Sequence, residues 1–201
     1  MTVFYTLERP EHAWGDYGDI LVHGMSCRPD DETEILELER TGPFISPITF
    51  PGISEIVVTD DMRGLLETSG LKGIGFRAIS KTRIVQSNWH TWDLNADDPA
   101  EYPPGGEPEG YILGHEHSLD ASEKIGQLWE VVLARTARVV RAGSICTKGE
   151  IRLVTASWRG EDLFMAQDVG YIYATEKAKH RLEEKVGCYV AFDVAGDASS
   201  A

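Results

Sequence analysis

The sequence is short of cysteine and has no long apolar run. Its three cysteines, Cys27, Cys146 and Cys188, form no CxxC pair and cannot all pair with one another, which is typical of thiols in a reducing compartment. No apolar run approaches the ~20 residues of a membrane span, and the N-terminal residues lack the basic start and apolar stretch of a secretion signal. We therefore expect a cytoplasmic protein with no membrane partner.

Basic residues are also scarce. The chain carries 19 Lys and Arg against 33 Asp and Glu, so its formal net charge is −14 and its pI is about 4.8. Nucleic acids and anionic membrane surfaces are bound largely through Lys and Arg. The composition therefore predicts no nucleic-acid partner.

Apolar residues are plentiful enough to form a core. They make up 42% of the 201 residues and include five Trp, seven Tyr and six Phe. Global disorder requires low hydrophobicity beside high net charge, so it is excluded. The length fits one domain, which we place at residues 1–195, with a disordered, frayed tail at 196–201.

Strand and helix patterns along the chain predict an α+β fold with mixed or antiparallel sheets and a few short helices. Strands are expected at 3–7, 19–23, 56–58, 74–80, 82–86, 111–113, 136–141 and 151–157. Helices are expected at 31–40, 59–69 and 120–134, although residues 129–133 also suit a strand. Residues 93–110, with four prolines and three glycines, are expected to form a long loop.

One strand–helix–strand pattern occurs twice, because segment 56–76 matches segment 172–192. The corresponding pairs are Ile56 and Ile172, Thr59 and Thr175, Asp60 and Glu176, Arg63 and Lys179, Leu66 and Leu182, Glu67 and Glu183, and Phe76 and Phe192. In each copy the threonine is expected to cap the helix, and the acidic residue favours the helix N-terminus. Two explanations stay open: a duplication giving two related halves, about 1–115 and 116–195, or convergence of two capped β-α-β units.

The negative charge is concentrated in two segments. Residues 30–39 carry six acidic residues and residues 93–123 carry nine, and neither segment contains Lys or Arg. Such segments can serve solubility alone. Their clustering favours a second interpretation, an acidic surface that speeds encounter with a basic partner protein and rejects wrong partners.

The long loop and the residues before it supply the expected partner-binding residues. Trp is enriched at binding hot spots, and Trp89 and Trp92 stand three residues apart, so they cannot both face one core from a plain strand. We expect one inside and the other against the acidic loop, with both in the core as the alternative. The expected binding residues are Trp89, Trp92, Asp93, Asp97, Asp98, Glu101, Tyr102, Glu107 and Glu109.

The sequence has no motif for nucleophilic catalysis, and the glycine-rich run at 70–75 suits the end of a helix better than a phosphate loop. An HxH pair on a strand places both rings on one face, which is one way to begin a metal site. Structural or solvent-facing histidines are the more common explanation, so we expect no metal and no other cofactor. The alternative ligands are His90, His115 and His117, with Asp93 and Glu116 beside them.

The repeated unit resembles that of immunity proteins from bacterial polymorphic-toxin systems, and in particular the Myxococcus-type family of contact-toxin immunity domains. The resemblance is carried by residues 58–63 (VTDDMR) with Leu66, Phe76 and Ala78, and by residues 174–179 (ATEKAK) with Leu182 and Phe192. The chain departs from some relatives in lacking paired CxxC motifs. The resemblance implies binding of a cognate toxin domain and blocking of its active site, and it implies no catalytic residues.

Charge and resemblance together predict an immunity or inhibitor protein. It would not be an enzyme, and its acidic surface would bind and neutralise a basic toxin domain. Two alternatives stay open. One is a metal-dependent enzyme that uses the histidine cluster, and the other is a scaffold module that binds another basic protein.

Overall fold

The computed structural model of the chain describes residues 2–29, 35–141, 151–167 and 169–198. The chain forms two compact units. Unit 1 consists of Met1–Arg9, Leu65–Gly75 and Val132–Ala201, and unit 2 consists of Pro10–Gly64 and Phe76–Val131. Three elements pass from one unit into the other along the chain: α2 (Asp60–Thr68), β6 (Ile74–Ala78) and β8 (Leu128–Leu133).

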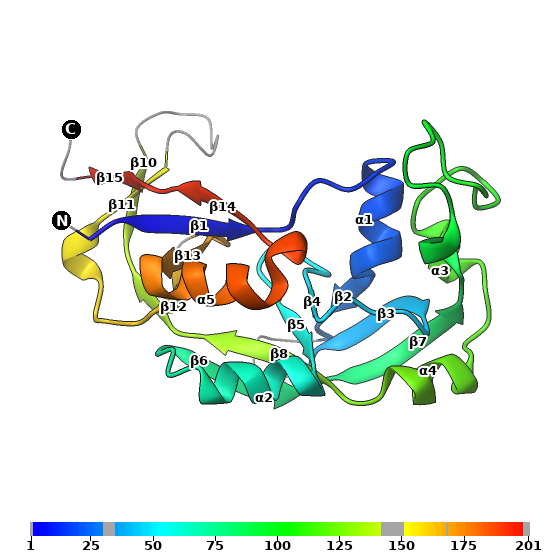
Figure 1. Cartoon of the computed structure of the whole chain (residues 1–201), viewed down its shortest axis with the longest axis horizontal. Coiled ribbons are helices and arrows are strands. Elements are labelled where there is room, and N and C mark those ends of the chain that lie inside the picture. The colour runs from blue at the N-terminus through cyan, green and yellow to red at the C-terminus, as the bar shows by residue number, and fades with distance from the viewer. Residues whose placement is uncertain (1, 30–34, 142–150, 168, 199–201) are drawn as a thin grey trace. The chain divides into compact units, whose positions relative to one another are not determined.

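Unit 1 is built on a five-stranded sheet of order β14-β1-β13-β12-β9 (Figure 1). Taken in that order, the strands are Ala191–Val194, Phe4–Glu8, Ile172–Thr175, Leu163–Ala166 and Arg135–Ala137. Strand β1 runs antiparallel to both of its neighbours. A second sheet has the order β10-β11-β15, formed by Val139–Arg141, Ile151–Leu153 and Gly196–Asp197.

Aromatic rings fill the core of unit 1. Phe164 stacks on Tyr173 with ring centroids 5.6 Å apart, and Phe4 meets Phe164 edge-on at 5.8 Å. Every residue of β12 and β13 is buried, which accounts for their continuous apolar runs. Helix α5 (Glu176–Val186) buries one stripe four residues apart, consisting of Ala178, Leu182 and Val186.

Unit 2 contains two sheets, of order β2-β3-β7 and β4-β5-β8-β6. Its remaining strands are β2 (Met25–Cys27), β3 (Glu37–Gly42), β7 (Ser80–Gln86), β4 (Ile48–Thr49) and β5 (Val57–Thr59). Its helices are α1 (Asp16–His23), α3 (Gly110–Leu113) and α4 (Leu119–Ile125), with a 3-10 turn at Trp89–Thr91. In the described ranges, no helix has the length and apolar character that crossing a membrane requires.

Strand β3 carries a fully buried arginine. Arg40 donates from Nε to the carbonyl oxygen of Thr41 at 2.9 Å, and from Nη2 to those of Val22 at 3.1 Å and Phe44 at 3.4 Å. Its Nη1 has no partner among the described residues. Burial lowers the pKa of Arg40, to about 9. The guanidinium therefore joins helix α1 to the end of strand β3 and the residues just after it.

The predicted α+β class is confirmed, with antiparallel and parallel strand pairs in the same sheets. Several expected elements are also found close to their predicted bounds. These are the strands at 3–7, 56–58, 74–80 and 82–86, the helix at 59–69 and the long loop at 93–110.

The expected strand at 19–23 is wrong, because these residues form the end of helix α1. Asp16 and Asp19 lie in the first turn, where negative charge favours the positive end of the helix dipole. Leu21 and Val22 are buried three and four residues after the buried Gly18, which is helical spacing. A short apolar run fits either structure, and here the acidic first turn and the helical stripe decide.

Other local predictions fail for similar reasons. The expected helix at 31–40 is wrong for residues 37–40, which belong to strand β3. Leu36, Leu38 and Arg40 are buried with the period of two that a strand gives. Residues 30–34 lie outside the described ranges. The expected strand at 111–113 is the short helix α3. The expected helix at 120–134 ends at Ile125, and the strand alternative holds from Leu128 as β8. The expected strand at 136–141 is split into β9 and β10, and β11 is followed by a 3-10 turn at Thr155–Ser157.

The two copies of the repeat have the same local structure. In each, a strand leads into a helix whose threonine caps it: Thr59 Oγ1 accepts the N–H of Met62, and Thr175 Oγ1 accepts the N–H of Ala178, both at 3.3 Å. In each copy, a third strand lies between the two strands of the unit, β8 between β5 and β6, and β1 between β13 and β14. Duplication and convergence both fit this likeness, and duplication stays a prediction.

The end of the chain is more regular than the expected tail at 196–201. Gly196–Asp197 form strand β15, which pairs in parallel with Arg152 and Leu153 of β11. Residues 199–201 lie outside the described ranges. The bounds of units 1 and 2 do not coincide with the halves 1–115 and 116–195, because each unit combines segments from distant parts of the sequence.

Candidate functional site

A cluster of aromatic side chains in unit 2 supports the long loop. Trp89 and Tyr111 are buried with Leu21 and Val22 of α1. Partly buried aromatic side chains pack against this group, namely Trp14, Tyr17, Phe44 and Trp92. The indole of Trp89 also donates from Nε1 to the buried hydroxyl of Thr41 at 3.1 Å. The cluster is thus a fixed base for the chain that follows residue 92.

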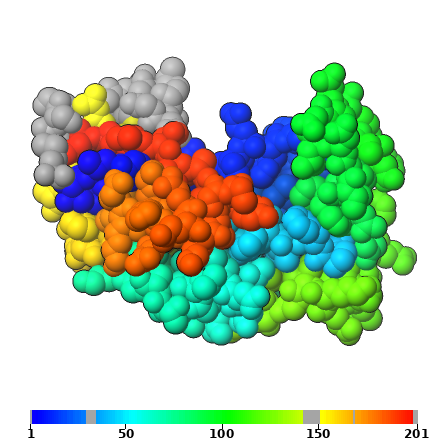
Figure 2. Space-filling model, viewed as in Figure 1, coloured from blue at the N-terminus to red at the C-terminus, as the bar shows by residue number. Residues whose placement is uncertain are grey.

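The loop itself, residues 93–109, is called the acidic segment below. Its backbone is tied to the aromatic cluster at three points. Trp14 Nε1 donates to the carbonyl oxygen of Ala96 at 3.0 Å, and the hydroxyls of Tyr17 and Tyr111 donate to the carbonyl oxygens of Gly106 and Glu101. Pro99 and Pro103 are buried. Figures 1 and 2 show the green segment beside the blue helix α1, consistent with these bonds.

The carboxylates of the acidic segment face solvent. Its six acidic residues are all exposed: Asp93, Asp97, Asp98, Glu101, Glu107 and Glu109. Asp98 accepts the hydroxyl of Tyr102, and Asp93 accepts the backbone N–H of Asn95 at 3.0 Å. Within the described ranges no Lys or Arg forms an ion pair with any of the six. The segment is therefore a fixed backbone that presents uncompensated negative charge.

The two tyrosines at the segment are held in the neutral form. The hydrogen bond to Asp98 raises the pKa of Tyr102, to about 12. Burial raises the pKa of Tyr111, to about 12, with smaller contributions from Tyr17 and Tyr102. Both phenols therefore keep their donor protons at any pH near neutral.

The structure separates the two predicted tryptophans. Trp89 is buried, with 6% of its surface exposed, and so it supports the surface rather than forming it. Trp92 is half-buried and tilts against Trp14 with ring centroids 6.0 Å apart. Trp89 therefore lies within the buried cluster, and Trp92 packs against that cluster from its edge. Four of the six acidic residues of the other acidic segment, 30–39, lie outside the described ranges, because these leave out residues 30–34.

The histidines proposed as alternative metal ligands have separate contacts. His90 stacks on Phe44 with ring centroids 4.9 Å apart, and His117 Nδ1 accepts the N–H of Ile84 at 3.0 Å. His115 is exposed and its carbonyl oxygen accepts from Arg83. In the described part of the chain, these three do not form a group with metal-ligand spacing.

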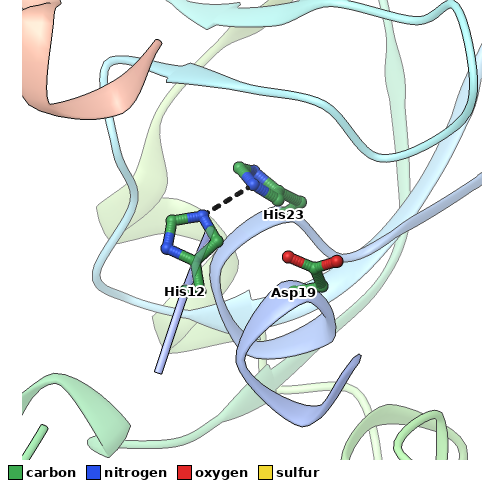
Figure 3. A group of neighbouring side chains, drawn as sticks. All are labelled: His12, Asp19 and His23. Carbon is green, nitrogen blue, oxygen red and sulfur yellow. Dashed lines mark hydrogen bonds between the residues drawn. The ribbon is translucent and has the colours of Figure 1, made fainter. Parts of the chain in front are cut away.

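A different group has that spacing. His12, Asp19 and His23 each offer one ligand atom, and these atoms lie within 4.8 Å of one another. Figure 3 shows the two imidazoles facing each other through their Nε2 atoms, which are 2.9 Å apart, with the Asp19 carboxylate on the preceding turn of α1. His23 is buried, and the other two are half-buried.

The hydrogen bonds of His23 determine where its proton lies. The backbone N–H of Phe50 donates to Nδ1 of His23 at 3.2 Å, so Nδ1 carries no proton. A neutral imidazole then has its proton on Nε2, from where it donates to Nε2 of His12. A metal-bound histidine normally has the opposite arrangement, with its second nitrogen donating to an oxygen. The group therefore fits a proton held between two imidazoles better than a metal centre.

Sequence reasoning missed this group because it assigned 19–23 to a strand. Asp19 and His23 would then lie ~13 Å apart along the strand, whereas four residues of helix rise only ~6 Å. An acidic residue four positions before a histidine on a helix was the available signal. The position of His12 depends on the turn at Trp14 and Gly15, where φ is positive at both residues. No sequence pattern predicts that turn.

No model of a known protein family matches the chain, and no curated protein matches it. The resemblance to immunity proteins therefore stays a prediction.

Proposed function

We propose that the protein binds a basic partner protein through the acidic segment of unit 2, and that this partner is a toxin domain whose active site the complex blocks. One observation carries the proposal: the backbone of the segment is tied down at three points, while its six carboxylates are exposed and form no ion pair with any Lys or Arg that the structure describes. The protein acts by binding alone, in the cytoplasm, without a cofactor.

The fixed backbone favours binding over a role in solubility. Charge that serves solubility needs no defined geometry, and a mobile loop supplies it equally well. A binding surface gains from preorganisation, because ordering a loop on association costs ~0.5–1.5 kcal/mol for each immobilised side chain. The three bonds from Trp14, Tyr17 and Tyr111 remove part of that cost before the partner arrives.

The unpaired carboxylates account for the class of partner. Because no Lys or Arg of the described residues forms an ion pair with them, their field extends into solvent over roughly a Debye length, ~10 Å at 0.1 M salt. Such a field steers a basic partner and raises association rates from ~10⁵–10⁶ to as much as ~10⁸–10⁹ M⁻¹s⁻¹. Toxin domains that act on nucleic acids have basic clefts. The toxin itself is inferred from the resemblance of the repeated unit and not from the surface.

The experiment begins with the partner. The tagged protein is captured at low salt from the cells that produce it, and the protein that co-purifies is identified and expressed. Association is then measured by stopped flow for the wild type and for the triple variant Asp97→Ser, Asp98→Ser and Glu101→Ser. We expect an association rate at least about tenfold lower for this variant at low salt, and a smaller difference at high salt.

A matched control changes the same charge elsewhere. Glu176, Glu183 and Glu184 are exposed acidic residues of α5 in unit 1, and replacing all three by Ser removes the same three negative charges. This variant should associate within about twofold of the wild-type rate, because local charge controls steering. Equal slowing by both triple variants would show that net charge matters and the segment does not. An unchanged rate in the first variant removes the acidic segment from the binding surface.

A second variant tests preorganisation without changing charge. Tyr17→Phe with Tyr111→Phe removes two of the three bonds that hold the acidic segment. We expect weaker binding by about 3- to 30-fold, mainly through faster dissociation, with the salt dependence of association unchanged. If affinity does not change, the fixed backbone has no part in binding. Inhibition of the toxin's activity by the protein is the final test, since binding without inhibition contradicts the proposed role.

A further inference from the structure

The basic residues of the protein, like its acidic residues, are unevenly distributed along the sequence. Residues 135–159, in unit 1, carry five Arg and one Lys against a single acidic residue. The rest of the chain is therefore even more acidic than its net charge of −14 indicates. Binding of a basic protein by unit 2 makes no use of this segment, so it needs a separate explanation.

Residues near the two ends of the basic segment line a hollow in unit 1, with a volume of about 320 Å³. The lining residues include Thr136 of β9, Arg138, Trp158, Arg159 and Gln167, which follows β12. Pockets for small ligands begin at about this size.

The two arginines of the hollow have no counter-ion. Arg138 and Arg159 are exposed, and within the described ranges neither guanidinium forms an ion pair or a hydrogen bond. Other basic residues of unit 1 do have acidic partners, which are Asp162 for Lys177, Glu183 for Lys179 and Glu184 for Arg181. Glu161 accepts the backbone N–H of Arg159 but does not line the hollow. The positive charge there is therefore uncompensated.

The fold holds the walls of the hollow in place. The N–H of Arg138 donates to Ser157 Oγ at 2.8 Å, and that hydroxyl in turn donates to the carbonyl oxygen of Val154 at 2.6 Å. The N–H of Gln167 donates to the carbonyl oxygen of Ala137 at 2.9 Å. Trp158 Nε1 donates to the carbonyl oxygen of Glu161 at 2.7 Å. Each element that supplies a lining residue is thus bonded to a neighbouring segment.

We propose that this hollow binds the oxyanion group, phosphate or carboxylate, of a small ligand. Arg138 and Arg159 supply the charge and the paired N–H donors that match such groups. The site belongs to unit 1 and does not depend on the partner surface proposed for unit 2.

The test uses inorganic phosphate and succinate as probes, in a buffer free of both, with the full chain labelled with nitrogen-15. The side-chain Nε–H signals of Arg138 and Arg159 are followed by NMR as each anion is added. We expect saturable shifts at these two signals, with a dissociation constant near 1 mM for the preferred anion. The tighter of the two probes identifies the source class, a phosphorylated compound or a carboxylic acid.

Variants make the test specific. Arg138→Gln with Arg159→Gln should weaken binding at least tenfold. Arg181→Gln on α5, which removes an exposed arginine outside the hollow, should leave binding unchanged. Because the two arginines of the hollow are exposed, the double variant should melt within a few degrees of the wild type. Linear, unsaturable shifts, or equal binding by the double variant, would overturn the site.

Discussion

Replacing Asp162 in unit 1 has an effect on the free energy of unfolding that can be worked out from its hydrogen bonds. Its Oδ2 accepts the backbone N–H of Lys72 at 2.9 Å and Nζ of Lys177 at 3.0 Å, and its Oδ1 accepts the hydroxyl of Thr175 at 3.1 Å. The carboxylate is only 12% exposed. It therefore joins the chain near Gly70, strand β12 and the N-terminus of α5, where Thr175 is the cap.

The substitution Asp162→Asn keeps the shape and removes the charge. An amide has one acceptor oxygen, so it can face either Thr175 or the two lysine donors but not both. The Lys72 N–H then meets either a donor or a weaker neutral acceptor. Hydrogen bonds to charged groups contribute ~1.5–3 kcal/mol each to the free energy of unfolding. The ion pair with the half-exposed Lys177 adds only as much as a weak surface ion pair. We expect the free energy of unfolding to fall by about 2–4 kcal/mol, which lowers the melting temperature by about 5–15 °C.

Urea denaturation at pH 7 measures this loss, with Glu183→Gln as control. Glu183 pairs with Lys179 on the surface of α5, so its substitution should cost no more than ~0.5 kcal/mol. Equal, small losses in both variants would refute the reasoning. They would show that the contacts of the buried carboxylate contribute no more than a surface pair.

The pH dependence gives a second, independent check. Burial by itself raises the pKa of Asp162, but the three hydrogen bonds and the charge of Lys177 outweigh it and hold the pKa below its ordinary value of 3.8. A lowered pKa stabilises the fold above 3.8, and this contribution is lost as the pH falls through the folded-state value. The gap between wild type and Asp162→Asn should therefore close in that acidic range. A gap that stays constant down to pH 2 would indicate lost packing instead of lost charge.

Three further predictions concern other parts of the chain. Thr59→Ala removes a helix cap and should lower the free energy of unfolding by ~1 kcal/mol. Thr175→Ala should lower it more, because Thr175 both caps a helix and donates to the carboxylate of Asp162. Equal losses in urea denaturation would contradict this. Arg40→Lys should lower the unfolding free energy by about 2 kcal/mol or more, because one ammonium cannot reach three carbonyl groups as the planar guanidinium does; an unchanged denaturation midpoint would show that those bonds are dispensable. One equivalent of Zn²⁺ at pH 7.5 should leave the melting temperature unchanged, because His23 has its proton on the nitrogen that faces His12; a rise of several degrees that is lost in His12→Ala would contradict the assigned tautomer.

The sequence is most informative where structure is decided locally. Each copy of the repeat was predictable because a capping threonine, an acidic first turn and a helical apolar stripe all occur within a dozen residues. The short apolar runs at 19–23 and 111–113 were not predictable in the same way. They fit a strand and a helix equally, and distant packing decides between them. The acidic first turn of α1 was the available local signal, and it favours the helix.

The candidate site shows the same division. Residues 93–109 could be predicted to form an exposed acidic loop, and their six acidic residues are exposed. Two of the three bonds that hold the loop could not be predicted, because they come from Trp14 and Tyr17, about 80–90 residues earlier in the chain. The group of His12, Asp19 and His23 likewise needs a turn that no local pattern predicts. Contacts between distant segments depend on the whole fold.

The place of β1 in the sheet of unit 1 has a consequence for biosynthesis. β1 ends at Glu8, but its neighbours on both sides, β13 and β14, begin at Ile172 and Ala191. A ribosome that adds ~5–20 residues per second needs roughly 10–40 s to reach them. During that time both edges of β1 lack their partner strands. Unit 2, in contrast, has its last residue at Val131, so its whole sequence is synthesised before β13 and β14. Unit 2 can therefore form first on the ribosome, while β1 stays without its neighbouring strands, as a segment that a chaperone would protect.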